Sequence, residues 1–140
     1  MLFDTHAHLD DKRFDEDRDE LIRGLANRGV SRVINPGIDI DSSCQCIDLA
    51  EKYDILYAGI GIHPHEVSKV EDNYLDVLGS MAQHKKVVAI GEIGLDYYYD
   101  FSPREAQKKC FVEQIELGAQ LKLPIIIHNR DSHEDMLNIL

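Results

Sequence analysis

The ten residues from Val87 to Asp96, VVAIGEIGLD, join a short apolar run to a polar cluster, and this junction decides the expected fold. In a parallel sheet, strands that are buried on both faces have continuous apolar sequences rather than alternating apolar and polar residues. Val87 to Ile90 is such a run, and it leads directly into a segment that carries the carboxylate of Glu92. The stretch therefore predicts a buried strand with chemistry-bearing side chains at its C-terminal end.

The same junction occurs four more times along the chain. The expected strands are Met1 to Phe3, Val30 to Ile34, Ile55 to Ile60, Val87 to Ile90 and Pro124 to Ile127. The polar clusters that follow them are Asp4-Thr5-His6-Ala7-His8, Asn35-Pro36-Gly37, Ile62-His63-Pro64-His65, Gly91-Glu92-Ile93-Gly94-Leu95-Asp96 and His128-Asn129-Arg130. Because the strands are expected to be parallel, all five clusters lie at the same edge of the sheet.

Helical patterns separate the expected strands. Between residues 46 and 53, apolar side chains recur at i, i+3, i+4 and i+7, which predicts an amphipathic helix. Gly29 is expected to end the first helix in a left-handed conformation. The Ser102-Pro103-Arg104-Glu105 segment predicts a capping box with proline at the first helical position of the fourth helix. Ser132 to Asp135 marks the start of a fifth helix.

Alternating strands and helices predict an α/β fold with a parallel sheet, either an open doubly wound sheet or a closed (β/α)8 TIM-type barrel. An open sheet would concentrate ligand contacts at one switch point, usually with a glycine-rich phosphate loop after the first strand. No such loop is present, and polar clusters follow every strand, as in the active sites of barrels. We therefore expect residues 1–140 to form a single domain containing about the first four and a half βα units of a barrel.

Composition limits the possible functions. The 140 residues are 44% hydrophobic, and the 26 acidic and 15 basic side chains give a formal net charge of −11. This charge is the opposite of that on a surface that coats nucleic acid, so any polyanion must be bound locally. The chain shows neither a signal peptide nor a membrane-spanning run, and its 3 cysteines do not suggest a disulfide framework. These features predict a cytoplasmic protein.

Four side chains at the expected sheet edge form a candidate metal site. His6 and His8 are two residues apart, so both imidazoles face the same side of an extended chain. Glu92 and His128 follow the fourth and fifth strands and can converge on the same point. Nitrogen and carboxylate ligands together favour zinc, manganese, cobalt or nickel over magnesium or calcium. Glu92 is the candidate bridge between two ions about 4 Å apart.

Most of the candidate residues also have an explanation that involves no metal. His6 and His8 can form a hydrogen-bonded pair without a metal, and His63 and His65 can either touch substrate or order their loop. His84 and His133 are expected on the surface. Cys44 and Cys46 lie one residue apart in a helical pattern, so they point to different faces and make a poor pair of ligands. Glu92 could be a surface carboxylate, although its flanking glycines indicate a close backbone approach.

Four motifs in this order resemble the TatD family of metal-dependent deoxyribonucleases, within the amidohydrolase superfamily. They are Asp4-Thr5-His6-Ala7-His8-Leu9, Gly61-Ile62-His63-Pro64-His65, Gly91-Glu92-Ile93-Gly94-Leu95-Asp96-Tyr97 and Pro124-Ile125-Ile126-Ile127-His128-Asn129-Arg130. The resemblance spans essentially the whole chain. It implies a TIM barrel in which His6 and His8 bind one divalent ion, Glu92 is shared and His128 binds the second.

The resemblance also implies the reaction, which is 3′-to-5′ hydrolysis of DNA phosphodiester bonds. One or two ions, of zinc, manganese, cobalt, nickel or magnesium, would activate water and hold the phosphate. His63, His65 and Arg130 are candidate phosphate contacts. The small basic patch favours strand ends or single strands of DNA as the substrate.

Family members run to about 250 residues, the usual size of a barrel. The resemblance therefore places a further histidine ligand and an aspartate that acts as general base beyond Leu140. If 140 residues were the whole polypeptide, the open sheet edges would need cover from a second chain. Two other functions stay open, namely an amidohydrolase acting on C–N or ester bonds and a non-catalytic metal-binding subunit.

Overall fold

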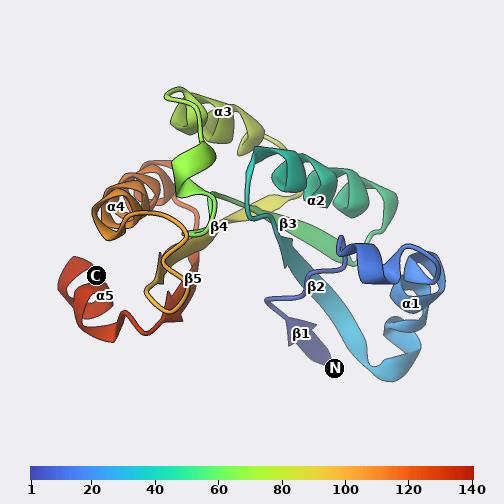
Figure 1. The fold of residues 1–140 in the computed structure, drawn as a ribbon. Helices are drawn as coiled ribbons and strands as arrows, with labels where there is room; N and C mark the ends of the chain where they lie inside the picture. The colour runs from blue at the N-terminus through green and yellow to red at the C-terminus, as the bar shows by residue number, and fades with distance from the viewer.

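In the computed structural model, which describes residues 1–140, five strands form one sheet in the order β1-β2-β3-β4-β5, with every neighbouring pair parallel. The sheet curls into a half-barrel with helices on its outer side (Figure 1). The strands are β1 (Leu2–Asp4), β2 (Val30–Pro36), β3 (Leu56–Ile60), β4 (Val87–Asp96) and β5 (Ile125–Arg130). This architecture confirms the prediction of a parallel, TIM-type fold.

One helix follows each of the last four strands, and α1 follows β1 after a longer connection, residues 5–17, that contains a 3-10 turn. The helices are α1 (Arg18–Gly24), α2 (Ile40–Lys52), α3 (Tyr74–Met81), α4 (Arg104–Leu121) and α5 (His133–Ile139), with 3-10 turns at Lys12–Phe14, Ala26–Arg28 and Val67–Lys69. Gly29 has a φ of 85° and the left-handed conformation that the sequence predicts, but it ends the 3-10 turn Ala26–Arg28 that follows α1 rather than α1 itself. None of the helices combines the length and the apolar character needed to cross a lipid bilayer.

Three strands extend further than the sequence indicates. β2, β4 and β5 continue through the polar clusters that were expected to follow them. Backbone pairing continues to the strand ends, where Gly94 lies opposite His128 and Asp96 lies opposite Arg130. The candidate site residues of β4 and β5 therefore stand on paired strands, which hold them more rigidly than loops would.

The predicted capping box at the start of α4 is wrong. Pro103 takes the N-cap position, and no side chain caps the helix. The buried Ser102 hydroxyl accepts a hydrogen bond from the Ser68 amide at 3.1 Å and donates one to the His65 carbonyl at 3.4 Å. Ser102 thus ties the loop after β4 to the loop after β3, because those long-range partners outcompete the local cap.

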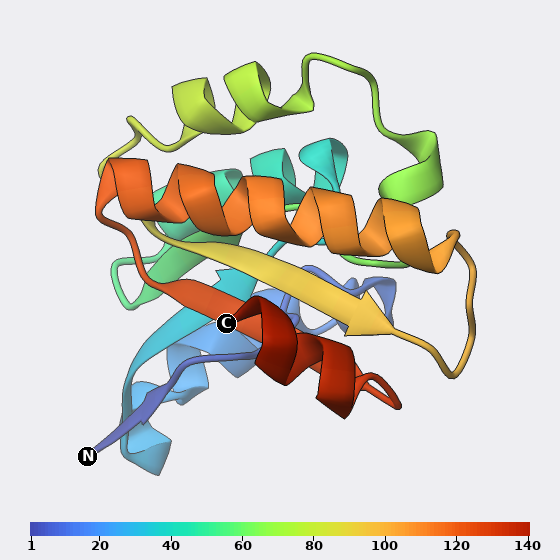
Figure 2. The same ribbon diagram turned by 90° about the vertical axis from the view of Figure 1, so that its left-hand side faces the viewer.

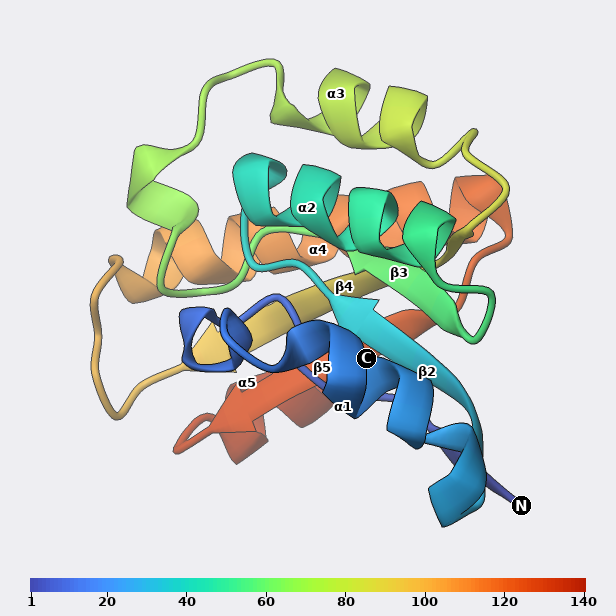
Figure 3. The same cartoon turned by 90° about the vertical axis from the view of Figure 1, so that its right-hand side faces the viewer.

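The hydrophobic core contains 20 buried side chains and lies between the sheet and the outer helices. Phe111 of α4 is 1% exposed and packs with Ile90 and Ile93 of β4 in this core. Figure 2 shows α4 lying along β4, and Figure 3 shows α2 lying over β2 and β3 on the same outer side. These contacts fix the strands whose C-terminal ends carry the polar residues.

Two buried glutamines connect α4 to the backbone of the site. Gln107 accepts a hydrogen bond from the Asp96 amide at 2.8 Å and donates to the carbonyls of Asp96 at 3.1 Å and Ser102 at 2.8 Å. Gln114, two turns further along the same helix face, accepts from the Ile62 amide at 2.8 Å and donates to its carbonyl at 3.1 Å. Each glutamine therefore satisfies backbone groups at the C-terminal edge of the sheet that would otherwise be buried without partners.

Gly94→Ala is expected to destabilise the chain by at least about 1–3 kcal/mol, the usual effect of overpacking. The φ of Gly94 is 147°, and a Cβ atom there would collide with the backbone of His128 on β5. Urea denaturation followed by circular dichroism measures the effect. Gly79→Ala is the control, because Gly79 lies in α3 and its added Cβ would meet only Leu117, at 3.9 Å. Equal unfolding midpoints for the two variants would contradict the steric argument.

Candidate metal centre

His6, His8 and Glu92 bring three ligand atoms to one point at the C-terminal edge of the sheet. The two histidines follow β1, and their Nε2 atoms lie 3.2 Å apart. Glu92 reaches the same point from β4, with Oε2 at 3.3 Å from His6 Nε2 and 3.4 Å from His8 Nε2. The structure therefore brings together the first three of the four ligands expected from the sequence.

These three distances fit a divalent metal ion. Zinc bonds to histidine nitrogen and carboxylate oxygen are about 2.0–2.1 Å long, so ligands at tetrahedral corners lie about 3.3 Å apart. The separations of 3.2, 3.3 and 3.4 Å match three edges of such a tetrahedron. Both imidazoles also direct their Nε2 atoms towards the Glu92 carboxylate. A simple hydrogen-bonded pair of histidines does not require this arrangement.

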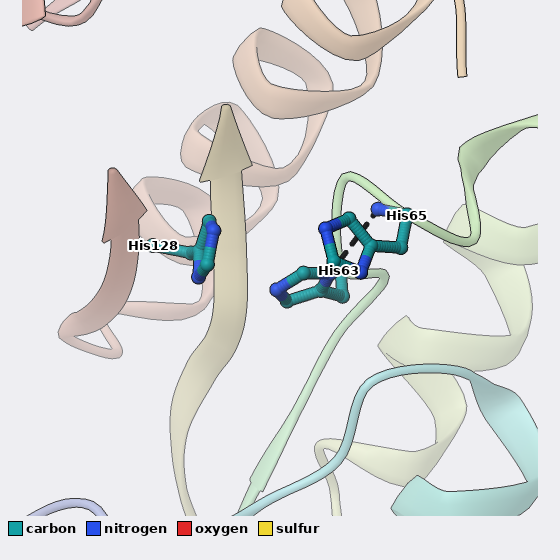
Figure 4. A group of neighbouring side chains, drawn as sticks. All are labelled: His63, His65 and His128. Atoms are coloured by element: carbon teal, nitrogen blue, oxygen red, sulfur yellow. Dashed lines mark hydrogen bonds between the residues drawn. The ribbon is translucent and has the colours of Figure 1, made fainter. Parts of the chain in front are cut away.

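A second group consists of His63, His65 and His128, each of which offers one ring nitrogen within 4.8 Å of those of the other two. Figure 4 shows the rings converging from two segments, the loop after β3 and strand β5. The ring centroids of His63 and His128 are 4.3 Å apart. The backbone amide of His65 donates a hydrogen bond to His63 Nδ1 at 3.1 Å, which orients the His63 ring.

Glu92 connects the two groups. Its Oε2 atom faces His6 and His8, while its Oε1 atom lies 2.9 Å from His128 Nδ1 and 4.0 Å from His63 Nε2. The residue is only 7% exposed. A carboxylate whose two oxygens face two separate sets of nitrogen atoms has the geometry needed to bridge two cations.

Asp96 belongs to the site and was not singled out from the sequence. Its Oδ2 atom lies 2.8 Å from His65 Nε2 and 2.9 Å from His128 Nε2, and the residue is fully buried. The sequence could have indicated Asp96, because it lies four residues after Glu92 and an even spacing places two side chains on the same face of a strand. The two carboxylates of β4 therefore hold His128 by its two ring nitrogens.

Burial and hydrogen bonding set the charge of this site. Burial alone would raise the pKa of Glu92, but hydrogen bonds with His128 and His8 lower it well below its ordinary value. Burial, and after it the nearby His128, lower the pKa of His63 to about 4. For His128, burial opposes the charged form, yet hydrogen bonds to Glu92 and Asp96 raise the pKa overall. Glu92 is thus ionised at neutral pH, as a metal ligand must be.

Arg130 lies outside both histidine groups. It is the last residue of β5, and its guanidinium lies over the rings of Tyr98 and Tyr99, at 4.2 and 4.9 Å from their centroids. The Tyr99 ring in turn contacts His65, with 5.3 Å between centroids. The structure therefore places this predicted phosphate contact beside the site.

The remaining candidates take no part in either group. His84 pairs with Glu51 at 2.9 Å, and His133 is exposed at the start of α5. Cys44 is exposed whereas Cys46 is buried, in agreement with the prediction that they occupy different faces of a helix.

Comparisons with known proteins identify the family of this chain. The model of the family described as TatD related DNase matches residues 3–140. A protein of Bacillus subtilis named "Uncharacterized metal-dependent hydrolase YabD" is 44% identical over 140 residues, which is 100% of this chain and 55% of the relative. The "3'-5' ssDNA/RNA exonuclease TatD" of Cronobacter sakazakii is 36% identical over 139 residues, covering 99% of this chain and 53% of that protein.

Solved structures agree with these relatives. The crystal structure of the TatD homologue YjjV from Escherichia coli K12 has a TM-score of 0.88 and 35% identity, covering 96% of this chain and 53% of its own. A TatD family hydrolase from Entamoeba histolytica has a TM-score of 0.90 at 28% identity, covering 99% of this chain and 52% of its own. The chain spans about half the length of the curated relatives it matches. The matching family model over residues 3–140 shows that this chain belongs to the TatD-related DNase family of metal-dependent hydrolases.

Proposed function

We propose that residues 1–140 form the metal-binding part of a metal-dependent deoxyribonuclease that hydrolyses DNA phosphodiester bonds from strand ends. One observation carries this proposal: Glu92 stands between two histidine groups and directs one oxygen to each. The relatives named as single-strand exonucleases support a nucleic-acid substrate. Because the matched relatives are about twice as long, the general base is assigned to the part of those proteins that this chain does not span.

In this proposal His6, His8 and Glu92 hold one divalent ion, and Glu92 and His128 contribute to a second. Zinc, manganese, cobalt, nickel or magnesium would supply Lewis-acid activation of water and of a phosphate oxygen. Asp96 holds the His128 ring through its Nε2 atom at 2.9 Å and so fixes its orientation. Carboxylate partners of this kind orient histidine ligands in many metal sites.

His63 suits a phosphate contact better than a metal ligand. Its Nδ1 atom accepts a hydrogen bond from the His65 amide, so in the neutral ring Nε2 carries the proton. A protonated nitrogen cannot bind a metal, but it can donate a hydrogen bond to a phosphate oxygen. The His65 ring lies beside that of His63, with 4.4 Å between centroids, and His65 and Arg130 remain proposed phosphate contacts, which offset the acidic surface.

We also propose a cytoplasmic location. All three cysteines are free thiols, which is the usual state in a reducing compartment. Association with a second chain stays a prediction for the case that 140 residues are the whole polypeptide; it would cover the two outer strands, β1 and β5, each of which pairs with one neighbour only.

Metal removal tests the proposed function. The whole protein, stripped with a chelator, is expected to leave a single-stranded oligonucleotide intact, and added Mn²⁺ or Zn²⁺ is expected to restore release of nucleotides. Chromatography of the products measures the reaction, with a lactone and an amide as control substrates. Hydrolysis of a control substrate but not of the oligonucleotide would contradict the assignment to DNA. Stoichiometric metal binding without any hydrolysis would show that this chain is a non-catalytic metal-binding protein.

A further inference from the structure

An exposed group of aromatic rings follows β4. Tyr98, Tyr99 and Phe101 are 59%, 46% and 62% exposed. The rings of Tyr99 and Phe101 are stacked, with centroids 5.1 Å apart and an interplanar angle of 17°, and Tyr98 meets Tyr99 edge-on at 4.7 Å. Three large aromatic side chains within four residues leave an apolar surface in contact with water, which points to a binding role. We call these three residues the aromatic platform.

The backbone that carries the aromatic platform is held at both ends. Asp96 Oδ1 accepts hydrogen bonds from the amides of Tyr98 and Tyr99, at 3.1 and 3.0 Å. Directly after Phe101, the buried Ser102 accepts hydrogen bonds from the Ser68 amide at 3.1 Å and from the Gln107 side chain at 2.8 Å. A surface fixed in this way loses little conformational entropy when a ligand binds, so it is suited to recognition.

The aromatic platform borders the candidate metal centre. The His65 ring meets Tyr99 edge-on at 5.3 Å and Phe101 at 4.9 Å. Asp96 provides a second link, because one of its oxygens holds the platform backbone while the other lies 2.9 Å from His128 Nε2. A ligand that reaches the histidine groups along this side must therefore pass over the aromatic rings.

Arg130 adds an unneutralised positive charge to the platform. Its guanidinium lies over Tyr98 and Tyr99 and forms no ion pair with a carboxylate. The chain as a whole carries a formal charge of −11, so an unpaired arginine at this position attracts anions to one place. Flat apolar rings combined with an arginine match the chemistry of nucleotides, which have a stacking base and a phosphate.

We propose that Tyr98, Tyr99 and Phe101 bind unpaired bases of a nucleic-acid strand by stacking, while Arg130 contacts the adjoining phosphate. This inference rests on the proposed function, since it supplies the base-recognition surface for a strand whose phosphodiester lies at Glu92. Stacking accepts every base because each has a π-face, so the aromatic platform gives affinity without sequence preference. A base that is paired inside a duplex has no free face to offer, so the platform selects single strands.

Binding of two matched oligomers tests the proposal. One is a fluorescently labelled oligothymidylate, and the other has the same length and phosphates but abasic sugars. Fluorescence anisotropy in EDTA gives both dissociation constants without cleavage, and their ratio isolates the contribution of the bases. The wild-type chain is expected to prefer the thymidylate strand on the order of tenfold, in line with the usual effect of stacking on an aromatic side chain.

Tyr99→Leu and Phe101→Leu keep an apolar side chain but remove the ring, so each is expected to lose most of this preference. Tyr57→Leu is the matched control, because Tyr57 near the start of β3 also lies under a cation, the Lys86 ammonium at 4.8 Å, but at the opposite edge of the sheet. This control is expected to keep the wild-type ratio. Circular dichroism confirms that each variant is folded.

Different outcomes separate this inference from the proposed function. A wild-type chain that cleaves DNA with Mn²⁺ but binds the two oligomers equally overturns the stacking role alone. A chain that prefers the thymidylate strand but never cleaves it supports stacking and overturns the proposed reaction. A preference retained in both Tyr99→Leu and Phe101→Leu, or lost equally in Tyr57→Leu, also overturns the inference. So does failure of the wild-type chain to bind either oligomer.

Discussion

Glu92→Gln is expected to lower the affinity of the chain for Zn²⁺ by more than about a hundredfold. Loss of a group that only orients a ligand already costs about 10–100-fold in metal affinity. Glu92 contacts both histidine groups directly and contributes the carboxylate that His6 and His8 face. Glutamine preserves the shape of the side chain but removes its charge, so the change tests the carboxylate itself.

Isothermal titration calorimetry with Zn²⁺ measures the effect of this substitution. Glu116→Gln is a matched control, because Glu116 is an exposed carboxylate on α4, and its loss is expected to leave the affinity unchanged. Wild-type affinity and stoichiometry in Glu92→Gln would show that the carboxylate neither binds nor bridges the ions.

Gln107→Leu is expected to destabilise the fold by several kcal/mol. Each buried polar group left without a partner costs about 1–3 kcal/mol. The Gln107 side chain forms hydrogen bonds with the amide and carbonyl of Asp96 and with the carbonyl of Ser102. The substitution leaves these three backbone groups without that partner. Leucine has a similar volume, so the loss reports on hydrogen bonding rather than on a cavity.

Urea denaturation measures the free energy of unfolding of Gln107→Leu and of a control variant, Gln120→Leu. Gln120 lies on the exposed side of the same helix, so its substitution is expected to change the free energy of unfolding by less than about 0.5 kcal/mol. Equal stabilities of the two variants would mean that the hydrogen bonds between α4 and the Asp96 backbone contribute nothing measurable.

The order of the elements could be predicted because it depends on local patterns. Continuous apolar runs such as Val87 to Ile90 gave the strands, and helical spacing gave the helices between them. The meeting of His6 and His8 with Glu92 followed from the rule that parallel strands end at one edge. Their roles as ligands remain predictions.

Local sequence patterns did not predict the hydrogen bonds that a side chain forms with residues far away in the sequence. Ser102 has the sequence signature of a helix cap, but its hydroxyl bonds to the loop that carries His65. Gln107 and Gln114 look like ordinary helix surface residues, yet each is buried against backbone from another element. No short-range spacing encodes such partners, because they are chosen by the packing of α4 on the sheet.

The most direct test of the metal centre is anomalous X-ray diffraction from crystals of the chain grown with Zn²⁺. We predict a peak about 2.1 Å from His6 Nε2, His8 Nε2 and Glu92 Oε2 together, because zinc binds nitrogen and oxygen ligands at that distance. Crystals that show no peak there at saturating zinc, or show zinc only on exposed side chains elsewhere, would contradict the account.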